Sequence, residues 1–360
     1  MKLLGALIVF GLVAPVARAT NVCDSYLANC KSTDVRRASE SVSKGRVEYF
    51  NAVIAEMTVA AEDTLTRESS FVGEGDENAA VKAKLDVARA IVKLSDTPLT
   101  PVALKEQEEQ ITFLIKEYKT HFGELDEVNI FTRLEKPSLE QTKTTFEAVK
   151  STLIASIQSK TEIPAETREK MVAKVKNIRY RGAAETAKVN PFEMEMECGV
   201  VFHYAGYDID AEAGTVTLCP AAIRGFDSID LVPELTAALV EAAGLEDAEF
   251  DPVYRQYWTC LEEQVASAAD PKDRQIDNRR AAENYWIFEA VFRYRNNGKR
   301  DETAVAKSLG LACLTPLVRP PLSTSMTSVR SYADHFNCPR NKPRCDLGGP
   351  VSVDGDTGSN

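Results

Sequence analysis

Apolar residues recur at helical spacing through the first half of the chain. Residues three and four positions apart lie on one face of an α-helix, so this spacing predicts amphipathic helices that bury their apolar faces together. Thr100-Pro101 marks one helix start, because the threonine hydroxyl caps the first turn and proline is tolerated in it. We predict a helical bundle over residues 34–189. One of its apolar stripes consists of Phe50, Val53, Ile54, Met57 and Ala61.

The pattern changes after residue 190. Residues 198–204 (CGVVFHY) and 215–219 (TVTLC) are short runs rich in β-branched and aromatic residues, separated by a turn-like Ala-Glu-Ala-Gly. Such runs predict the two strands of a β-hairpin. Residues 228–244 (SIDLVPELTAALVEAAG) then return to helical spacing, and they end at a glycine, which commonly terminates helices.

Two more helices are predicted further along. Residues 251–265 begin with Asp-Pro and carry an aromatic stripe, while residues 281–294 (AAENYWIFEAVFRY) are apolar on nearly every side and predict a deeply buried helix. The glycine-rich residues 346–360 predict a disordered tail. The expected fold class is therefore mainly α with a small β-hairpin (α+β), in which the bundle precedes a disulfide-stapled core over residues 190–345.

The first 19 residues have the form of a signal peptide. Lys2 gives a positive start, residues 3–16 form a short apolar core, and Ala17-Arg18-Ala19 is a small-x-small cleavage site. The apolar core is shorter than the roughly 18 residues that a membrane-spanning helix needs, and no later segment reaches that length. We expect an exported protein, periplasmic or extracellular, without a membrane span.

All cysteines follow the predicted cleavage site. An even number of cysteines in an exported chain favours disulfides, and the lack of any C-x-x-C pattern argues against a zinc cluster. The eight are Cys23, Cys30, Cys198, Cys219, Cys260, Cys313, Cys338 and Cys345.

Spacing suggests some of the cysteine pairs. Two pairs share the spacing C-x6-C and are expected to close small loops, one of them within an N-terminal arm over residues 20–33. A third pair is placed to bridge the predicted hairpin, and the remaining connectivity stays open. These pairs are Cys23 with Cys30, Cys338 with Cys345, and Cys198 with Cys219.

The charge balance restricts the kind of partner. The formal net charge is −11, and removal of Lys2 and Arg18 with the signal peptide makes the mature chain more acidic. An acidic chain without a basic run does not suit nucleic acid or an anionic membrane surface. Another exported protein is the expected kind of partner, and the sequence does not identify it.

Common catalytic and metal-binding patterns are missing from the sequence. The histidines are His121, His203 and His335, and no two have the spacing of a zinc site. No G-x-S-x-G, phosphate-binding loop or dinucleotide-binding pattern occurs. The acidic segment at residues 208–214 (DIDAEAG) lacks the ligand spacing of a calcium loop, so we interpret it as a solvated hairpin tip. We therefore predict neither a metal site nor a cofactor.

Two glutamates lie in otherwise apolar helices. Burial raises a carboxyl pKa, so Glu241 and Glu283, with His203 on the predicted strand, are the candidate catalytic residues of a hydrolase of unrecognised mechanism. In the alternative interpretation, the two glutamates have a structural role, and either lies at a solvent-exposed edge of its helix or pairs with Arg279 or Arg280. In the same alternative, His203 is a hydrogen-bonded strand residue.

The order of elements from residue 198 to residue 294 resembles the catalytic core of secreted bacterial HExxH metallopeptidases of the zincin superfamily. In that family, a strand run like residues 207–220 precedes the metal-binding helix, and a later helix carries an acidic third ligand. That later helix would correspond here to residues 279–287, with Arg280 or Glu283 at the ligand position.

This chain departs from the family at the metal ligands. Val240 and Gly244 stand where the family has its two histidines, and only Glu241, at the general-base position, keeps its type. Valine and glycine offer no lone pair to a metal. The resemblance therefore implies a pseudoenzyme with a zincin-like core and a binding, regulatory or envelope-structural role. A helical module that binds a partner through residues 34–185 is a further hypothesis.

Overall fold

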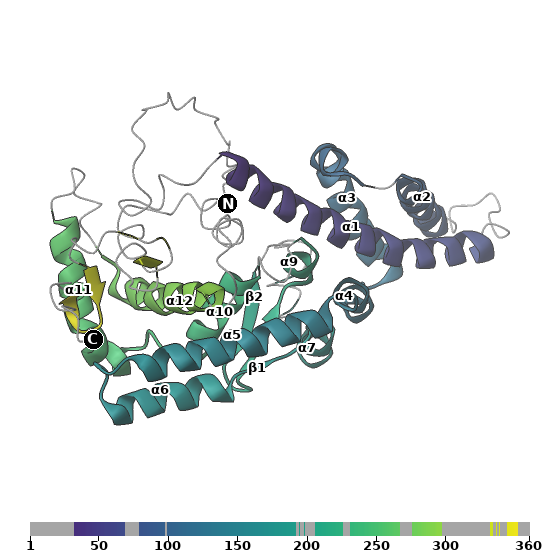
Figure 1. Cartoon of the computed structure of the whole chain (residues 1–360). Helices are drawn as coiled ribbons and strands as arrows, with labels where there is room; N and C mark the ends of the chain where they lie inside the picture. Colours follow the sequence, from purple (N-terminus) through teal and green to yellow (C-terminus); the bar gives the residue numbers. More distant parts are fainter. Residues whose placement is uncertain are drawn as a thin grey trace.

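The computed structural model (Figure 1) is mostly helical and contains a small three-stranded sheet, which confirms the predicted class of a mainly α protein with a small β part. None of its described helices is both long and apolar enough to cross a membrane. The signal peptide, the arm predicted at residues 20–33 except its last two residues, which begin a helix, and three cysteines, Cys23, Cys30 and Cys313, lie outside the described residues. Those residues are 32–68, 79–97, 99–191, 194, 198, 206–225, 231–266, 276–296, 332–333, 336, 338 and 344–351.

Four helices open the described chain. The helix α1 is the longest, and both α2 and α3 pack against it (Figure 1). The stripe from Phe50 to Ala61 is buried in this packing, as its spacing predicts. The N–H of Ala103 donates to Thr100 Oγ1 at 3.1 Å, so the predicted cap of α3 is confirmed. The four are α1 (Ser32–Glu68), α2 (Ala79–Ser95), α3 (Pro101–Phe122) and α4 (Glu127–Glu135).

The buried apolar residues gather in two clusters. One involves α1 to α4 and α7 (Ala183–Val189), and the other begins at Phe146 in α5 (Leu139–Ser159) and includes α6 (Ala165–Asn177). The apolar stripe of α5 therefore packs with the later helices, although the sequence pattern assigned α5 to the bundle. Helical spacing shows which face of a helix is buried but not which element covers that face.

The sheet has the order β1-β3-β2. Its hairpin, β2 (Tyr207–Asp210) with β3 (Thr215–Leu218), is antiparallel, and β1 (Arg179–Tyr180) pairs with β3 in parallel. The hairpin confirms the strand predicted at residues 215–219, and its partner strand is residues 207–210. Of the other predicted strand, residues 199–204 lie outside the described residues. The connecting turn is only residues 211–214, so its first strand must end at Asp210. The sequence did not predict β1.

The later elements form the second cluster around α12, whose middle is deeply buried as its composition predicts. Residues 346–351 correct the prediction of a disordered tail from residue 346, because they complete the β4–β5 hairpin, which packs on α11. Composition alone does not reveal such packing. The elements are α9 (Pro220–Gly225), α10 (Val232–Ala242), η3 (Ala248–Phe250), α11 (Asp251–Val265), α12 (Asn278–Asn296), β4 (Arg344–Asp346) and β5 (Gly349–Val351).

Two disulfides are described. The bond between Cys198 and Cys219 confirms the pairing expected at the hairpin. The other joins Cys260 of α11 to Cys345 of β4, so the expected pairing of Cys345 with Cys338 is wrong. Docking of β4 on α11 brings together two cysteines that are 85 residues apart in sequence, a contact that local spacing does not predict. Cys338 is also disulfide-bonded.

The helices α1 and α9 cross with almost no space between their backbones. A Cβ atom added at Gly45 would lie 2.1 Å from the carbonyl oxygen of Ala221, and one added at Gly225 would lie 2.4 Å from that of Ser41. Both distances are shorter than any tolerable van der Waals contact. Glycine is therefore required on both sides of the crossing.

A buried carboxylate caps α7. Glu135, at the end of α4, accepts hydrogen bonds from the N–H groups of Ala183 at 2.6 Å and Ala184 at 3.2 Å. Burial raises the pKa of the Glu135 carboxyl, and the two hydrogen bonds act in the opposite direction. The side chain satisfies two N–H groups that have no partner within the first turn of a helix.

We expect Glu135→Ala to lower the free energy of unfolding by about 2–4 kcal/mol, because it leaves two buried N–H groups without acceptors. Urea denaturation of the oxidised protein measures this loss. Glu140→Ala is the matched control, since Glu140 is exposed on α5 and its side chain pairs with Lys143 at the surface. A control effect as large as that of Glu135→Ala would contradict the capping role.

Candidate functional site

The helix α10 lies at the centre of the second cluster. It packs against α5 and α12, and it also contacts both strands of the β2–β3 hairpin. Its apolar side chains, from Val232 to Val240, give it one buried side, and Pro233 lies in its first turn. The described part of the helix predicted at residues 228–244 is thus α10, and it contacts both the hairpin and α12.

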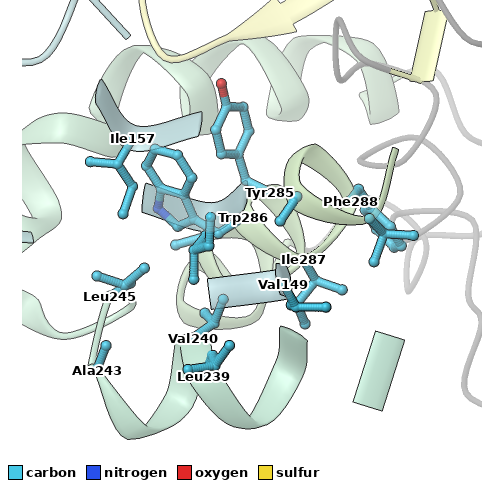
Figure 2. Packing of buried hydrophobic residues seen from close by; sticks show 14 of the residues in the cluster. Val149, Ile157, Leu239, Val240, Ala243, Leu245, Tyr285, Trp286, Ile287 and Phe288 are labelled. Carbon is cyan, nitrogen blue, oxygen red and sulfur yellow. The ribbon is translucent and has the colours of Figure 1, made fainter. Parts of the chain in front are cut away.

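Val240 faces the core. Its side chain is fully buried, and Figure 2 shows it among Leu239, Leu245 and Trp286, with Ile157 of α5 in the same cluster. The resemblance drawn from the sequence aligns Val240 with the first metal-binding histidine of the zincin pattern. At this position the protein has close apolar packing, in which a metal ion would have no space and no polar ligand.

Gly244 ends α10. The N–H of Leu245 donates to Val240 O at 3.1 Å, and the N–H of Gly244 donates to Glu241 O at 2.8 Å, which is the paired arrangement of a Schellman motif. Gly244 has φ +55°, and a Cβ atom there would lie 2.1 Å from Asp247 Oδ2. The helix therefore stops before the position of a second helical histidine, and that position admits only glycine without strain.

A chain of hydrogen bonds holds the end of α10 in place. Trp286 Nε1–H of α12 donates to Tyr254 Oη at 2.7 Å, and the Tyr254 hydroxyl donates to the carbonyl oxygen of Leu245. These polar groups are all buried, and each has a partner. The chain connects α12 and α11 to the segment that follows Gly244.

Glu241 points away from this core. It is exposed, and its Oε2 accepts a hydrogen bond of 2.8 Å from the hydroxyl of Tyr207 on β2. The pKa of Tyr207 is raised, first by burial, then by the charge and hydrogen bond of Glu241, and further by the charges of Glu283 and Glu234. A tyrosine in these surroundings stays protonated and acts as a hydrogen-bond donor.

Glu283 lies near this pair, on α12. Burial raises the pKa of its carboxyl, the charges of Glu246 and Glu241 act in the same direction, and Arg280 acts against them. Arg280 Nε is 3.9 Å from Glu283 Oε2, so one of the two arginine pairings weighed from the sequence is present. The structure thus brings both candidate glutamates to one region, between β2 and the first turns of α12.

Sequence reasoning missed two further carboxylates here. Glu246 is buried and accepts from Arg279 Nη2 at 3.1 Å, and burial raises the pKa of its carboxyl. Burial also raises the pKa of Glu234 to about 7. Glu234 and Glu241 are seven positions apart, so the two lie on one face of α10, and this spacing was the available signal. Glu246 follows the helix and gave no such signal.

The histidines do not complete a described site. His121 lies on α3, with Nε2 3.7 Å from Glu117 Oε2. His203 and His335 lie outside the described residues, so the pairing of His203 with Glu241 or Glu283 stays a prediction. Within the described ranges, no group of three histidine, cysteine, aspartate or glutamate side chains is arranged to hold a metal ion.

A groove of about 460 Å³ adjoins Glu241. The end of α6, the hairpin tip and the end of α10 line it, with polar side chains from Lys174, Asn177, Glu212, Glu241 and Asp247. The C-terminal ends of both helices carry partial negative charge, and three of these five side chains are carboxylates. Lys174 is itself paired with Glu249 at 2.5 Å. The groove therefore suits a cationic group.

Comparison with known proteins adds no assignment, since no family model, curated protein or solved structure matches the chain.

Val240→His should lower the free energy of unfolding by about 2–4 kcal/mol, because it places a polar ring in a closely packed apolar site. Chemical denaturation measures the change. Ala242→His is the matched control on the same helix, since Ala242 is partly exposed and its replacement should cost much less. Equal effects of the two substitutions would show that Val240 does not pack as described.

Glu234→Gln should stabilise the protein at pH 8 and not at pH 4. Between about pH 4.5 and pH 7 the unfolded chain loses the Glu234 proton while the folded protein keeps it, so stability falls as the pH rises through this window. Glutamine does not ionise, and its advantage at pH 8 is on the order of 2 kcal/mol. Urea denaturation at both pH values tests this, with exposed Glu212→Gln as control. An equal stability of Glu234→Gln and wild type at pH 8 would contradict it.

Proposed function

We propose that this is an exported, non-catalytic protein with a core like that of zinc metallopeptidases, which acts by binding another protein. The proposal rests on how Val240 and Gly244 are used at the end of α10. Val240 is packed into the core there, and Gly244 ends the helix in a left-handed conformation. The positions of both zinc-binding histidines are thus used for packing and helix termination, and zinc-activated water has no place to form.

The arrangement around α10 supports the likeness to a peptidase core. In the resemblance drawn from the sequence, a hairpin precedes the metal-binding helix, and a later helix carries an acidic third ligand. Here α10 contacts β2, β3 and α12, and Glu283 of α12 lies within electrostatic reach of Glu241. Glu241, the residue type kept from the pattern, makes a hydrogen bond with Tyr207. In a non-catalytic protein, this pair positions β2 against α10.

The groove beside Glu241 supports a binding role. Its carboxylates, Glu212, Glu241 and Asp247, and the two helix ends attract positive charge. A lysine or arginine side chain of another exported protein has the matching chemistry. The disulfides Cys198–Cys219 and Cys260–Cys345 support export, since such bonds persist in oxidising compartments.

A partner-binding role for the first helices has less support. Among their described residues, α1 to α3 expose large apolar side chains at Val59, Val102 and Phe113. Single exposed apolar residues are normal on a protein surface. The charged groove is the better-supported binding surface.

Zinc content and peptidase activity test the proposal. We expect the purified mature protein, saturated with zinc and then dialysed, to retain far less than one zinc ion per chain. We also expect no cleavage of a mixed peptide library above a buffer control. Stoichiometric zinc or chelator-sensitive cleavage would overturn the proposal.

Two variants separate the hydrolase alternative from the non-catalytic proposal. Glu241→Gln and His203→Ala remove the glutamate and the histidine that such a mechanism would use. If the protein is non-catalytic, any trace cleavage in the preparation should be unchanged in both variants. Loss of cleavage in both, with folding intact by circular dichroism, would favour a hydrolase that uses these two residues.

A further inference from the structure

A buried group of charged residues lies where α5, α12 and β4 meet, apart from the groove. Lys160, which ends α5, is 6% exposed, and Asp346 of β4 and Glu289 of α12 are 5% and 7% exposed. Lys160 Nζ lies 3.1 Å from Asp346 Oδ1 and 3.4 Å from Oδ2. The same nitrogen is 3.7 Å from Glu289 Oε1. One amine therefore faces two carboxylates, with almost no access to water.

The carboxylate of Asp346 is polarised at one oxygen. Its Oδ1 accepts hydrogen bonds from the hydroxyl of Tyr285 and from the N–H of Leu347, the latter at 2.9 Å. Two donors on one oxygen stabilise negative charge that develops there when a nucleophile attacks the carboxyl carbon. The arrangement is that of an oxyanion hole, and Oδ2 is left as the oxygen that would depart.

Glu289 is placed to carry protons. Its Oε1 is the oxygen near Lys160, and its buried Oε2 has no hydrogen-bond partner among the described residues. An unpartnered buried carboxylate oxygen is unfavourable for stability alone. The free oxygen is explained if Glu289 takes protons from an amine and returns them to a leaving oxygen, because such a carboxylate needs an oxygen that can accept a proton.

The surroundings exclude water and fix the reacting groups. Lys160 Nζ lies 5.1 Å from the centre of the Tyr285 ring, and Tyr257 packs edge-on against that ring at 5.0 Å. The neighbouring Cys345 is fixed to α11 by its disulfide with Cys260, which holds β4 in place. Groups held at contact distance in a dry site react far faster than the same groups free in solution.

We propose that Lys160 and Asp346 join through an intramolecular amide bond between Nζ and Cγ. A lysine ammonium and an aspartate carboxylate contain the atoms of this amide plus one water molecule, and both sides carry no net charge. The reaction therefore needs no oxidant, reductant or other reactant. It replaces a buried ion pair, whose desolvation is costly, with a neutral bond.

The proposed steps use each of the neighbours described above. Glu289 transfers one proton from the Lys160 ammonium to Asp346 Oδ2, which leaves a neutral amine and a neutral acid. The nitrogen lone pair then forms the N–C bond, and the carbonyl electron pair moves to Oδ1, where Tyr285 and Leu347 donate. Glu289 transfers a second proton from nitrogen to Oδ2. The carbonyl re-forms, the C–Oδ2 bond breaks, and Oδ2 departs as water.

Mass spectrometry of the purified full-length protein tests the proposal. Trypsin does not cut after an acylated lysine, so a reduced digest should contain residues 151–168 joined to residues 345–360. The joined fragment should weigh one water molecule less than the two peptides together, and its fragmentation should place the bond at Lys160 and Asp346. Separate, unmodified peptides from protein that retains the Cys260–Cys345 disulfide would overturn the proposal, as would a water loss located elsewhere.

Three variants assign the roles. Lys160→Arg should abolish the joined fragment, and Glu289→Gln, which keeps the side-chain size, should slow its formation at least tenfold when samples are taken over time after refolding, because a positioned general acid–base contributes about 10²–10⁴-fold in rate. Lys170→Arg is the control, since Lys170 forms an exposed ion pair with Glu249, and it should keep the full yield. Detection of the Cys260–Cys345 disulfide in each unreduced variant confirms folding. Formation of the joined fragment in folded Glu289→Gln at the rate of the wild type would overturn the proton-carrying role.

Discussion

The packing of Trp286 over the last turn of α10 is the contact on which the second cluster depends. Trp286 covers Val240 and donates to Tyr254, which in turn donates to the carbonyl oxygen of Leu245. The turn is left-handed at Gly244, so its backbone groups need these partners to remain buried. The same contact determines where Glu241 points, because Val240 faces inward and the next residue on the helix must face the hairpin.

Much of the local structure could be predicted from the sequence. The stripe from Phe50 to Ala61, the cap at Thr100 and the helix stop at Gly244 each follow from residues within a few positions of one another. The contacts between distant segments could not be predicted in this way. Three such contacts depend on how completed elements dock. They are the pairing of β1 with β3, the packing of the later helices on α5, and the disulfide of Cys345 with Cys260. Periodicity carries no information about docking.

The candidate site shows the same division. Glu241 and Glu283 stand out in the sequence because each interrupts an apolar helix, and the structure places both near Tyr207. The partner of Glu241 comes from a strand 34 residues earlier, and Glu246 has no pattern around it. Lys160 and Asp346 are 186 residues apart, so their contact became visible only in the folded chain. A charged residue is assigned a role by what surrounds it, and those neighbours are mostly non-local.

The glycine crossing of α1 and α9 has a consequence for the alignment of the first helices. A slip of α1 by one residue would put the side chain of Lys44 or Arg46 against the carbonyl oxygen of Ala221, where not even a Cβ atom fits. The helix therefore has a single register on α9, fixed both along its axis and around it. Because α2 and α3 pack on the same continuous helix (Figure 1), their positions relative to α9 are determined by this one crossing.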